Sequence, residues 1–200
     1  MFITFEGIDR SGKTTQAKLL AKALGDEAVL VREPGGTPAA ERIRDLVKDP
    51  QVELSPIAET LLFGAARAGL IEQVIRPALD AGKAVISDRY VDSTVAYQGG
   101  ARGLGIDRVE ELNEWITGGL WPDVTFLLDL PPSLARERAQ EDDRFEREGE
   151  TLQRAVEAAY EELAARHPER YVRIDAGRSK LDVHGDVLAE VEARRAEAVR

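Results

Sequence analysis

The chain has 200 residues, of which 43% are hydrophobic and 32% charged, and its formal net charge is −10. This length favours one domain with its own core, and the acidic balance argues against a nucleic acid polymer or an acidic membrane surface as partner. The absence of cysteine excludes disulfides and thiolate zinc sites. No charged-then-apolar leader precedes the first apolar run, and no run approaches the length of a membrane span, so we expect a cytoplasmic protein.

Residues 2–15 predict a buried strand, a tight loop and the start of a helix. Residues 7–14 match the phosphate-binding motif G-x-x-x-x-G-K-[ST]. Gly7 and Gly12 let backbone amides approach an anion, and the dipole of the following helix adds to the attraction. We expect Lys13 to reach the β- and γ-phosphates and the Thr14 hydroxyl to ligate Mg²⁺. A glycine-rich turn that only caps a helix is the weaker alternative, because strand and helix flank the motif as required. The motif therefore predicts a nucleoside triphosphate site.

The segment between this motif and residue 80 predicts one more strand and three helices. Helical spacing of alanine and leucine predicts a helix over 15–25, and the apolar run 28–31 predicts the second strand. A Pro-Gly-Gly sequence makes 32–36 a loop. Thr37 followed by proline predicts a capped helix that ends near residue 47. A long helix over 57–79 follows, whose wide apolar face we expect to lie across the middle of the domain.

The second half of the chain continues the alternation. The apolar run 84–87 predicts the third strand, 91–97 a helix, and the glycine-rich stretch 98–105 a flexible loop. Asp107 and Glu110 resemble a capping box at the start of a helix that ends near residue 117. The remaining predicted elements are a strand at 124–130, a helix that opens at Pro131-Pro132, a charged segment at 136–150, a helix at 151–166, a strand at 171–175 and a helix at 181–195.

This order of elements predicts the fold class. Strands alternate with helices, and the strands are apolar at successive positions, as in a parallel sheet covered on both faces. The chain carries no internal repeat and no linker. We therefore expect a single three-layer α/β domain over 1–200, with a parallel five-stranded sheet flanked by helices.

Polar residues follow three of the predicted strands. In open parallel sheets, ligands bind at the carboxyl ends of the strands. Asp88, directly after the third strand, is where a carboxylate would hold Mg²⁺ together with Thr14, although a helix N-cap is the alternative. Arg89 and Lys13 would repel each other at one site unless anionic oxygens lay between them. This pair therefore indicates a second substrate that carries phosphate.

Two other classes of nucleotide-binding protein compete with a phosphotransferase. The chain has no N-K-x-D guanine motif, which argues against a GTPase switch. A binding or motor ATPase remains possible. Transfer between two phosphorylated molecules requires many cations, because many negative oxygens meet. Arginines in the segments predicted to surround the site favour this transfer: Arg10, Arg32, Arg67, Arg89, Arg144 and Arg147.

The chain resembles the thymidylate kinase family over essentially its full length. This family transfers the γ-phosphoryl group of ATP to dTMP. The resemblance implies a P-loop NTPase fold, Mg²⁺ as cofactor and a homodimer packed through long helices. A kinase for another nucleotide or for a deoxynucleoside is the nearest alternative. The resemblance rests on FEGIDRSGKTT at 5–15, REPGGT at 32–37, LFGAAR at 62–67, DRY at 88–90, AYQGG at 96–100 and DRFE at 143–146.

The resemblance also implies roles for individual residues. Asp9 would contact the 3′-hydroxyl and phosphate side of dTMP, and Phe63 would stack on thymine. Arg67 would donate to the thymine O4, and Tyr97 would crowd the sugar 2′ position. The full set implied for dTMP is Asp9, Glu33, Pro34, Phe63, Arg67, Arg89, Thr94, Tyr97 and Gln98. The set implied for ATP is Gly7, Ile8, Asp9, Arg10, Ser11, Gly12, Lys13, Thr14, Thr15, Arg138 and Arg144.

Catalysis is expected to come from Lys13, Arg10, Arg89 and Asp9. The segment 136–150 resembles the family's lid, which closes over ATP, but here it contains the acidic run 141–143. We therefore predict that Arg10 supplies the catalytic cation, with Arg138 and Arg144 secondary. No general base is expected, because the acceptor is already a phosphate anion and positioning with charge screening carries the reaction.

Overall fold

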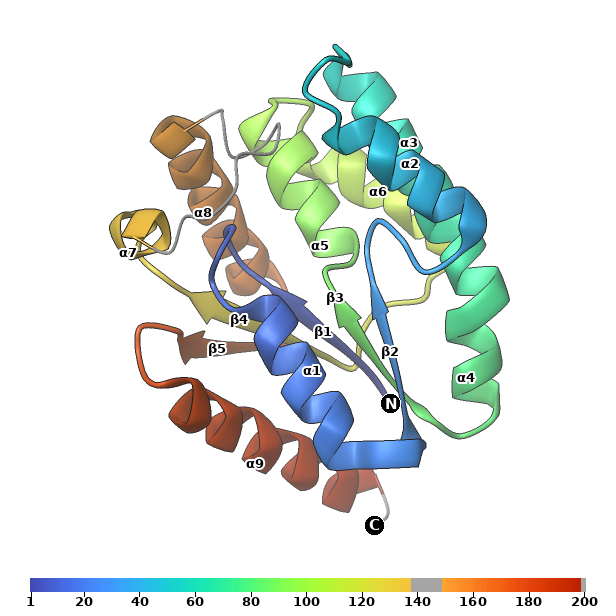
Figure 1. The fold of residues 1–200 in the computed structure, drawn as a ribbon, viewed down its shortest axis with the longest axis vertical. Helices are drawn as coiled ribbons and strands as arrows, with labels where there is room; N and C mark the ends of the chain where they lie inside the picture. Colours follow the sequence, from blue (N-terminus) through green and yellow to red (C-terminus); the bar gives the residue numbers. More distant parts are fainter. Residues whose placement is uncertain (138–148, 199–200) are drawn as a thin grey trace.

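The computed structural model describes residues 1–137 and 149–198. All five predicted strands are present and pair in parallel, in the order β2-β3-β1-β4-β5 (Figure 1). The strands are β1 (Phe2–Glu6), β2 (Ala28–Arg32), β3 (Ala84–Asp88), β4 (Val124–Asp129) and β5 (Tyr171–Asp175). The helical elements are α1 (Lys13–Leu24), η1 (Gly25–Glu27), α2 (Pro38–Lys48), α3 (Pro56–Leu70), η2 (Ile71–Ile75), α4 (Arg76–Asp80), α5 (Val91–Thr94), η3 (Val95–Ala101), α6 (Ile106–Thr117), α7 (Pro132–Glu137), α8 (Gly149–Arg166) and α9 (Lys180–Ala198).

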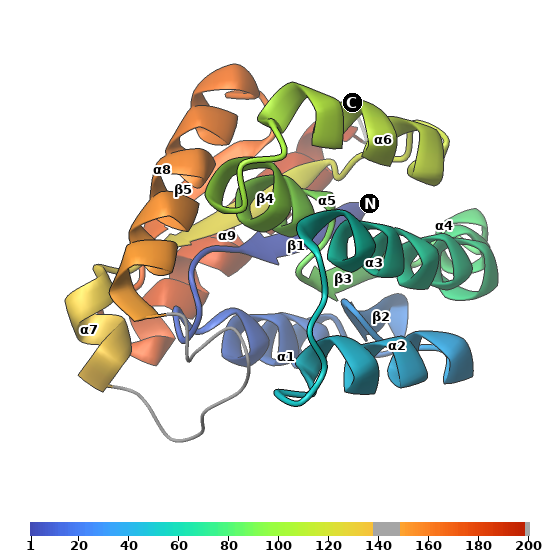
Figure 2. The same cartoon turned by 90° about the horizontal axis from the view of Figure 1, so that it is seen from above.

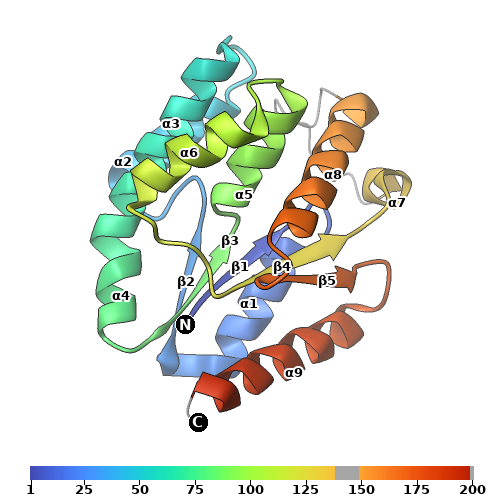
Figure 3. The same cartoon turned by 180° about the vertical axis from the view of Figure 1, so that it is seen from behind.

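Helices cover both faces of the sheet, as predicted for a three-layer α/β fold. Helices α1 and α9 pack against each other on one face, and α1 lies on the opposite side from α6 and α8 (Figure 2). Seen from behind, α6, α5 and α8 lie side by side over the second face (Figure 3). None of the helices within residues 1–137 and 149–198 is long and apolar enough to cross a membrane.

The central strands bury their side chains on both faces, which explains their unbroken apolar sequence. Every residue of β1 is buried, and Phe5 stacks on Phe126 of β4 with the ring centroids 5.3 Å apart. Burial of such a side chain contributes about 1.5–3 kcal/mol. The rigid sheet that results fixes the positions of the loops at its carboxyl edge.

The connections of β1 and β3 leave the sheet toward opposite faces. The chain leaves β1 through α1 on one face, whereas β3 leads into α5 on the other. In the parallel register Phe5 pairs with Asp88, so the ends of both strands lie side by side. Open α/β sheets bind their ligands in the crevice at such a switch point.

The long helix predicted over 57–79 is present but not regular. It divides into α3, the π-helical turn η2 and α4. Pro77 explains the break, because it lacks an N–H and its ring excludes the carbonyl four residues earlier, so the preceding turn widens. Its predicted burial is also wrong in part, because Leu61, Ala65 and Ala68 are exposed. The inward face of α3 instead carries polar residues, among them Glu59 and Arg67.

The stretch 98–105, predicted as a flexible loop, begins as helix. Residues 98–101 complete the π-helical η3, and Gln98 and Gly99 are buried. The glycines serve close packing: a Cβ on Gly100 would lie 2.5 Å from the Cβ of Ala159 in α8. The predicted capping box is wrong as well. Helix α6 begins after Gly105, and Asp107 accepts a hydrogen bond from Arg166 at 2.5 Å.

Candidate active site

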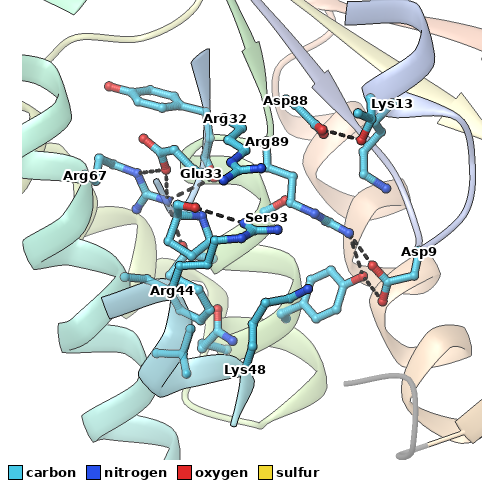
Figure 4. A pocket seen from close by; sticks show the side chains of 18 of the residues that line it. Asp9, Lys13, Arg32, Glu33, Arg44, Lys48, Arg67, Asp88, Arg89 and Ser93 are labelled. Atoms are coloured by element: carbon cyan, nitrogen blue, oxygen red, sulfur yellow. Dashed lines mark hydrogen bonds and ion pairs between the residues drawn. The ribbon is translucent and has the colours of Figure 1, made fainter. Parts of the chain in front are cut away.

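A cavity of about 250 Å³ opens at the carboxyl edge of β1, β2 and β3 (Figure 4). Most of the predicted site residues lie around this one space. Those that line it are Asp9, Arg10, Lys13, Thr14, Arg32, Glu33, Pro34, Phe63, Arg67, Asp88, Arg89, Thr94, Tyr97 and Gln98. The predicted residues Gly7, Ile8, Ser11, Gly12 and Thr15 are not in this lining and form the loop and helix start behind it.

The loop between β1 and α1 wraps around the ammonium group of Lys13. Gly7 has φ 134°, and a Cβ there would lie 2.7 Å from a backbone carbonyl of β4, so only glycine fits. The Lys13 Nζ donates to the backbone oxygen of Ile8 at 2.6 Å and to the Ser11 hydroxyl at 3.4 Å. Burial and then the charge of Arg89 lower the pKa of Lys13 to about 8. An anion at this position would restore the usual preference for the charged form.

Thr14, at the start of α1, and Asp88, at the end of β3, bring together two oxygen atoms that can ligate a cation. The Thr14 hydroxyl donates to Asp88 Oδ2 at 2.5 Å. Hydroxyl and carboxylate oxygens are the ligands that Mg²⁺ prefers. In the part of the chain that the structure describes, no group of three or more His, Cys, Asp or Glu could hold a metal by itself. The donor pair therefore fits a cation that takes its remaining ligands from substrate oxygens and water.

Asp9 and Arg89 form an ion pair at the centre of the site. Arg89 Nη2 donates to Asp9 Oδ1 at 2.5 Å, and Asp9 Oδ2 accepts from the Tyr97 hydroxyl at 3.0 Å. Burial opposes ionisation of Asp9, but Arg89 and Lys13 hold the pKa of its carboxyl below the ordinary value. The pair links the phosphate loop to the end of β3.

Arg89 is fixed from several directions. Its backbone has φ 72°, a conformation that non-glycine residues rarely adopt. Its Nη1 donates to the Ser93 hydroxyl at 2.9 Å, and its guanidinium lies 5.1 Å from the centre of the Tyr97 ring. Ser93 in turn donates to the buried carboxylate of Glu6 at 2.6 Å. Glu6 thus helps to position Arg89 through the Ser93 hydroxyl.

Arg67 and Glu33 form a second ion pair at the far end of the cavity. Arg67 Nε donates to Glu33 Oε2 at 2.8 Å, and both side chains are almost completely buried. Burial raises the pKa of Glu33, and the charge of Arg67 opposes that rise. Further bonds run from Arg67 to the Tyr90 carbonyl and to the Thr94 hydroxyl. The guanidinium is therefore held rigidly in the wall.

Several residues of the site escaped the sequence reasoning. Arg44 and Lys48 line the cavity from α2, and Arg44 donates to the Pro34 carbonyl at 2.9 Å. Their spacing of four on a predicted helix was the available signal. Gln153 of α8 donates to Asp9 Oδ2 at 3.0 Å, from 144 residues further along the chain. No local pattern could have indicated that contact.

Other predictions cannot be placed in the site. The arginines Arg138, Arg144 and Arg147, and most of the segment 136–150, lie outside the described residues.

Cations line the cavity from three parts of the fold: Lys13 from the phosphate loop, Arg89 from the end of β3, and Arg44 and Lys48 from α2. Such an arrangement suits phosphoryl transfer between two anionic molecules. The fold and the site define a P-loop kinase of the nucleoside monophosphate class. A family model described as "Thymidylate kinase" matches residues 5–187, and the chain belongs to this family.

Individual relatives agree with this family. The curated thymidylate kinase of Halorhodospira halophila is 48% identical, over 95% of this chain and 93% of its own. That of Halothermothrix orenii is 44% identical over 96% of both chains. Among solved structures, thymidylate kinase from Ehrlichia chaffeensis superposes with a TM-score of 0.80 at 34% identity, covering 96% of this chain and 98% of that one.

Proposed function

We propose that this kinase transfers the γ-phosphoryl group of Mg²⁺-bound ATP directly to the phosphate of dTMP, which yields ADP and dTDP. The observation that carries the proposal is the single cavity that joins the phosphate loop to the buried Arg67–Glu33 wall, with Arg89 between them. A triphosphate and a nucleoside monophosphate would then meet with their phosphates at Arg89.

On the donor side, the backbone and side chains of residues 7–15 would hold the triphosphate of ATP. Lys13 now donates to the carbonyl of Ile8, and a phosphate oxygen would replace that partner. Thr14 and Asp88 would hold Mg²⁺, which neutralises charge on the β- and γ-phosphates when bound. The helix dipole of α1 adds to the attraction.

On the acceptor side, Phe63 would stack on the thymine ring and Arg67 would donate to its O4. Tyr97 would contact the sugar beside C2′, and Asp9 would contact its 3′-hydroxyl. The remaining acceptor contacts would come from Glu33, Pro34, Arg89, Thr94 and Gln98. Phe63 and Arg67 lie four residues apart on α3, so both can reach the same base.

In the transfer itself, an oxygen of the dTMP phosphate forms a bond to the γ-phosphorus as the bond to the β–γ bridging oxygen of ATP breaks. No proton has to leave the acceptor, because its oxygen is already anionic. Arg89 and Arg10 would stabilise the charge spread over the moving phosphoryl group. Arg10 would be the principal cation, with Arg138 and Arg144 secondary, and 136–150 would close over ATP.

A homodimer forms part of the proposal. Ile57 and Leu61 of α3 are 61% and 54% exposed, and Trp115 of the neighbouring α6 is 80% exposed. Burial of these side chains against a second copy would favour association. Sedimentation equilibrium should then give twice the chain mass, and a monomer at all concentrations would contradict it.

The predicted cytoplasmic location stays a prediction.

The function is tested with a panel of acceptors under saturating Mg-ATP: dTMP, dUMP, CMP and thymidine. We expect ADP release with dTMP at least tenfold more efficient than with the others. Turnover of thymidine or of another monophosphate, without turnover of dTMP, would favour the neighbouring kinase class. ATP hydrolysis that needs no acceptor would favour a binding or motor ATPase.

A further inference from the structure

Helix α3 carries a buried carboxylate that the proposed mechanism does not use. Glu59 has no exposed surface, and it is not among the described residues that line the cavity. Its Oε1 accepts a hydrogen bond of 2.7 Å from Gln98 Nε2, and Arg102 Nε lies 3.3 Å from the same oxygen. Burial of a charge is costly unless it is paired, and Arg102 supplies the pairing charge. The ion pair with Arg102 thus places the Glu59 carboxylate directly behind Gln98, a residue of the cavity wall.

Two side-chain bonds join α3 to the α5–η3 helix, one in the cavity wall and one directly behind it. Near one end, Arg67 Nη2 donates to the Thr94 hydroxyl at 2.9 Å. Near the other, Gln98 donates to Glu59. The three α3 positions 59, 63 and 67 are spaced by four, so Phe63 lies between the two bonds on the same face. Phe63, Arg67 and Gln98 all line the cavity. We call the space between these three side chains the slot.

The bond from Gln98 to Glu59 fixes the direction of the Gln98 amide. An ionised carboxylate only accepts hydrogen bonds, so the NH₂ group of Gln98 must point toward Glu59. The amide oxygen of Gln98 then points away from Glu59. This assignment follows from the chemistry of the partner and does not depend on distinguishing nitrogen from oxygen by position.

Arg67 is oriented in the same manner, by Glu33. A guanidinium carries five N–H groups and accepts none. Within residues 1–137 and 149–198, Arg67 uses N–H groups on Glu33, Asn113, Tyr90 O and Thr94. Of the five N–H groups, the second one on Nη1 has no partner among these contacts. We take this N–H as the donor that the slot offers to a base, and the Gln98 carbonyl as the acceptor. Thymine and uracil present the complementary pair, an acceptor at O4 and a donor at N3–H, whereas cytosine presents the reverse.

We infer that Glu59 is a positioning residue that holds the Gln98 carbonyl toward the base and thereby selects acceptor nucleotides with a hydrogen on N3. The inference rests on the proposed function, because it takes the base of the acceptor to lie in the slot beside Phe63. Glu59 acts through Gln98 and does not itself contact the base. Without it, the Gln98 amide is free to turn and present its NH₂ group to cytosine N3.

The test compares dTMP, dUMP and 5-methyl-dCMP as acceptors under saturating Mg-ATP. Thymine and 5-methylcytosine differ only at the N3–C4 edge, whereas thymine and uracil differ only in the methyl group. In Glu59→Gln we expect the kcat/KM ratio of dTMP to 5-methyl-dCMP to fall about tenfold, mostly through KM, which corresponds to one hydrogen bond. The ratio of dTMP to dUMP should change less than twofold.

Two further variants sharpen this test. Glu72→Gln removes an exposed carboxylate from the adjoining turn η2 and should leave every ratio unchanged. The exchange Glu59→Gln/Gln98→Glu lets the new Gln donate to the new Glu, whose other oxygen then accepts from N3–H. This exchange should return the dTMP to 5-methyl-dCMP ratio to within about threefold of the original value.

Several outcomes would overturn the inference. One is an equal loss of activity toward all three acceptors in Glu59→Gln, because a merely structural role would have that effect. Another is an unchanged dTMP to 5-methyl-dCMP ratio. If Glu59→Gln shows no cooperative thermal transition, the test passes to the exchange variant Glu59→Gln/Gln98→Glu. An exchange variant that does not fold, or whose dTMP to 5-methyl-dCMP ratio stays low, then overturns the inference. An original protein that does not phosphorylate dTMP would instead overturn the proposed function.

Discussion

The two ends of the cavity are built in different ways. At the phosphate end, a continuous motif supplies backbone amides and Lys13, and two cations sit on unusual backbone, Arg10 at φ 65° and Arg89 at φ 72°. At the base end, the helices α3 and α5–η3 supply side chains that buried carboxylates orient, as Glu33 does for Arg67. In the proposed complex, charge would recognise phosphate at one end, and hydrogen-bond direction would recognise the base at the other. Mutations at the base end should therefore affect stability and base selectivity, whereas mutations at the phosphate end should affect the rate of transfer.

The largest loss of stability is expected at the base end. Arg67→Met leaves Glu33 buried without its partner, which typically costs about 3–5 kcal/mol of unfolding free energy. Urea denaturation followed by circular dichroism measures the effect. The double variant Arg67→Met/Glu33→Gln should recover part of the loss, because no unpaired charge remains. Equal instability of the single and double variants would show that the ion pair is not the cause.

The largest loss of rate is expected at the phosphate end. Arg89→Met should lower kcat with dTMP by roughly 10²- to 10³-fold, because it removes a preorganised cation from the transferring group. Thermal melting serves as the control for folding. If Arg89→Met raises KM for dTMP but leaves kcat unchanged, the prediction is wrong, and Arg89 contributes only to binding of the ground state.

Arg10→Gly tests which cation dominates. Glycine readily adopts φ 65°, so the loop should keep its shape. We expect kcat to fall about a hundredfold. Arg144→Ala is the matched comparison and should have the smaller effect. A nearly normal kcat in Arg10→Gly together with an inactive Arg144→Ala would reverse the assignment.

Glu6, which supports Arg89 through Ser93, gives a smaller effect that depends on pH. Burial and then the charge of Asp92 raise its pKa from 4.5 to about 7. Between these values the folded protein keeps a proton that the unfolded chain has released, so the stability due to this group falls as pH rises. From pH 5 to pH 8, Glu6→Gln should gain roughly 2–3 kcal/mol relative to the original protein. Parallel stability curves for the two proteins would contradict this.

The phosphate end could be predicted from the sequence far better than the base end. The strands and the loop around Lys13 are local patterns, so periodicity and one motif were sufficient. The contact of Asp9 with Gln153 and that of Glu33 with Arg67 join residues far apart in the chain, and no local signal marks them. The glycines after Gln98 indicated flexibility, whereas close packing against α8 is the reason for Gly100.

The central claim is that one cavity brings a triphosphate and a thymidine monophosphate together for direct transfer. The most direct measurement is the stoichiometry of products, by chromatography, after incubation with Mg-ATP and dTMP. We predict one dTDP for each ADP, with negligible ADP when dTMP is omitted. Release of ADP at the same rate with and without dTMP, and no dTDP, would contradict the account.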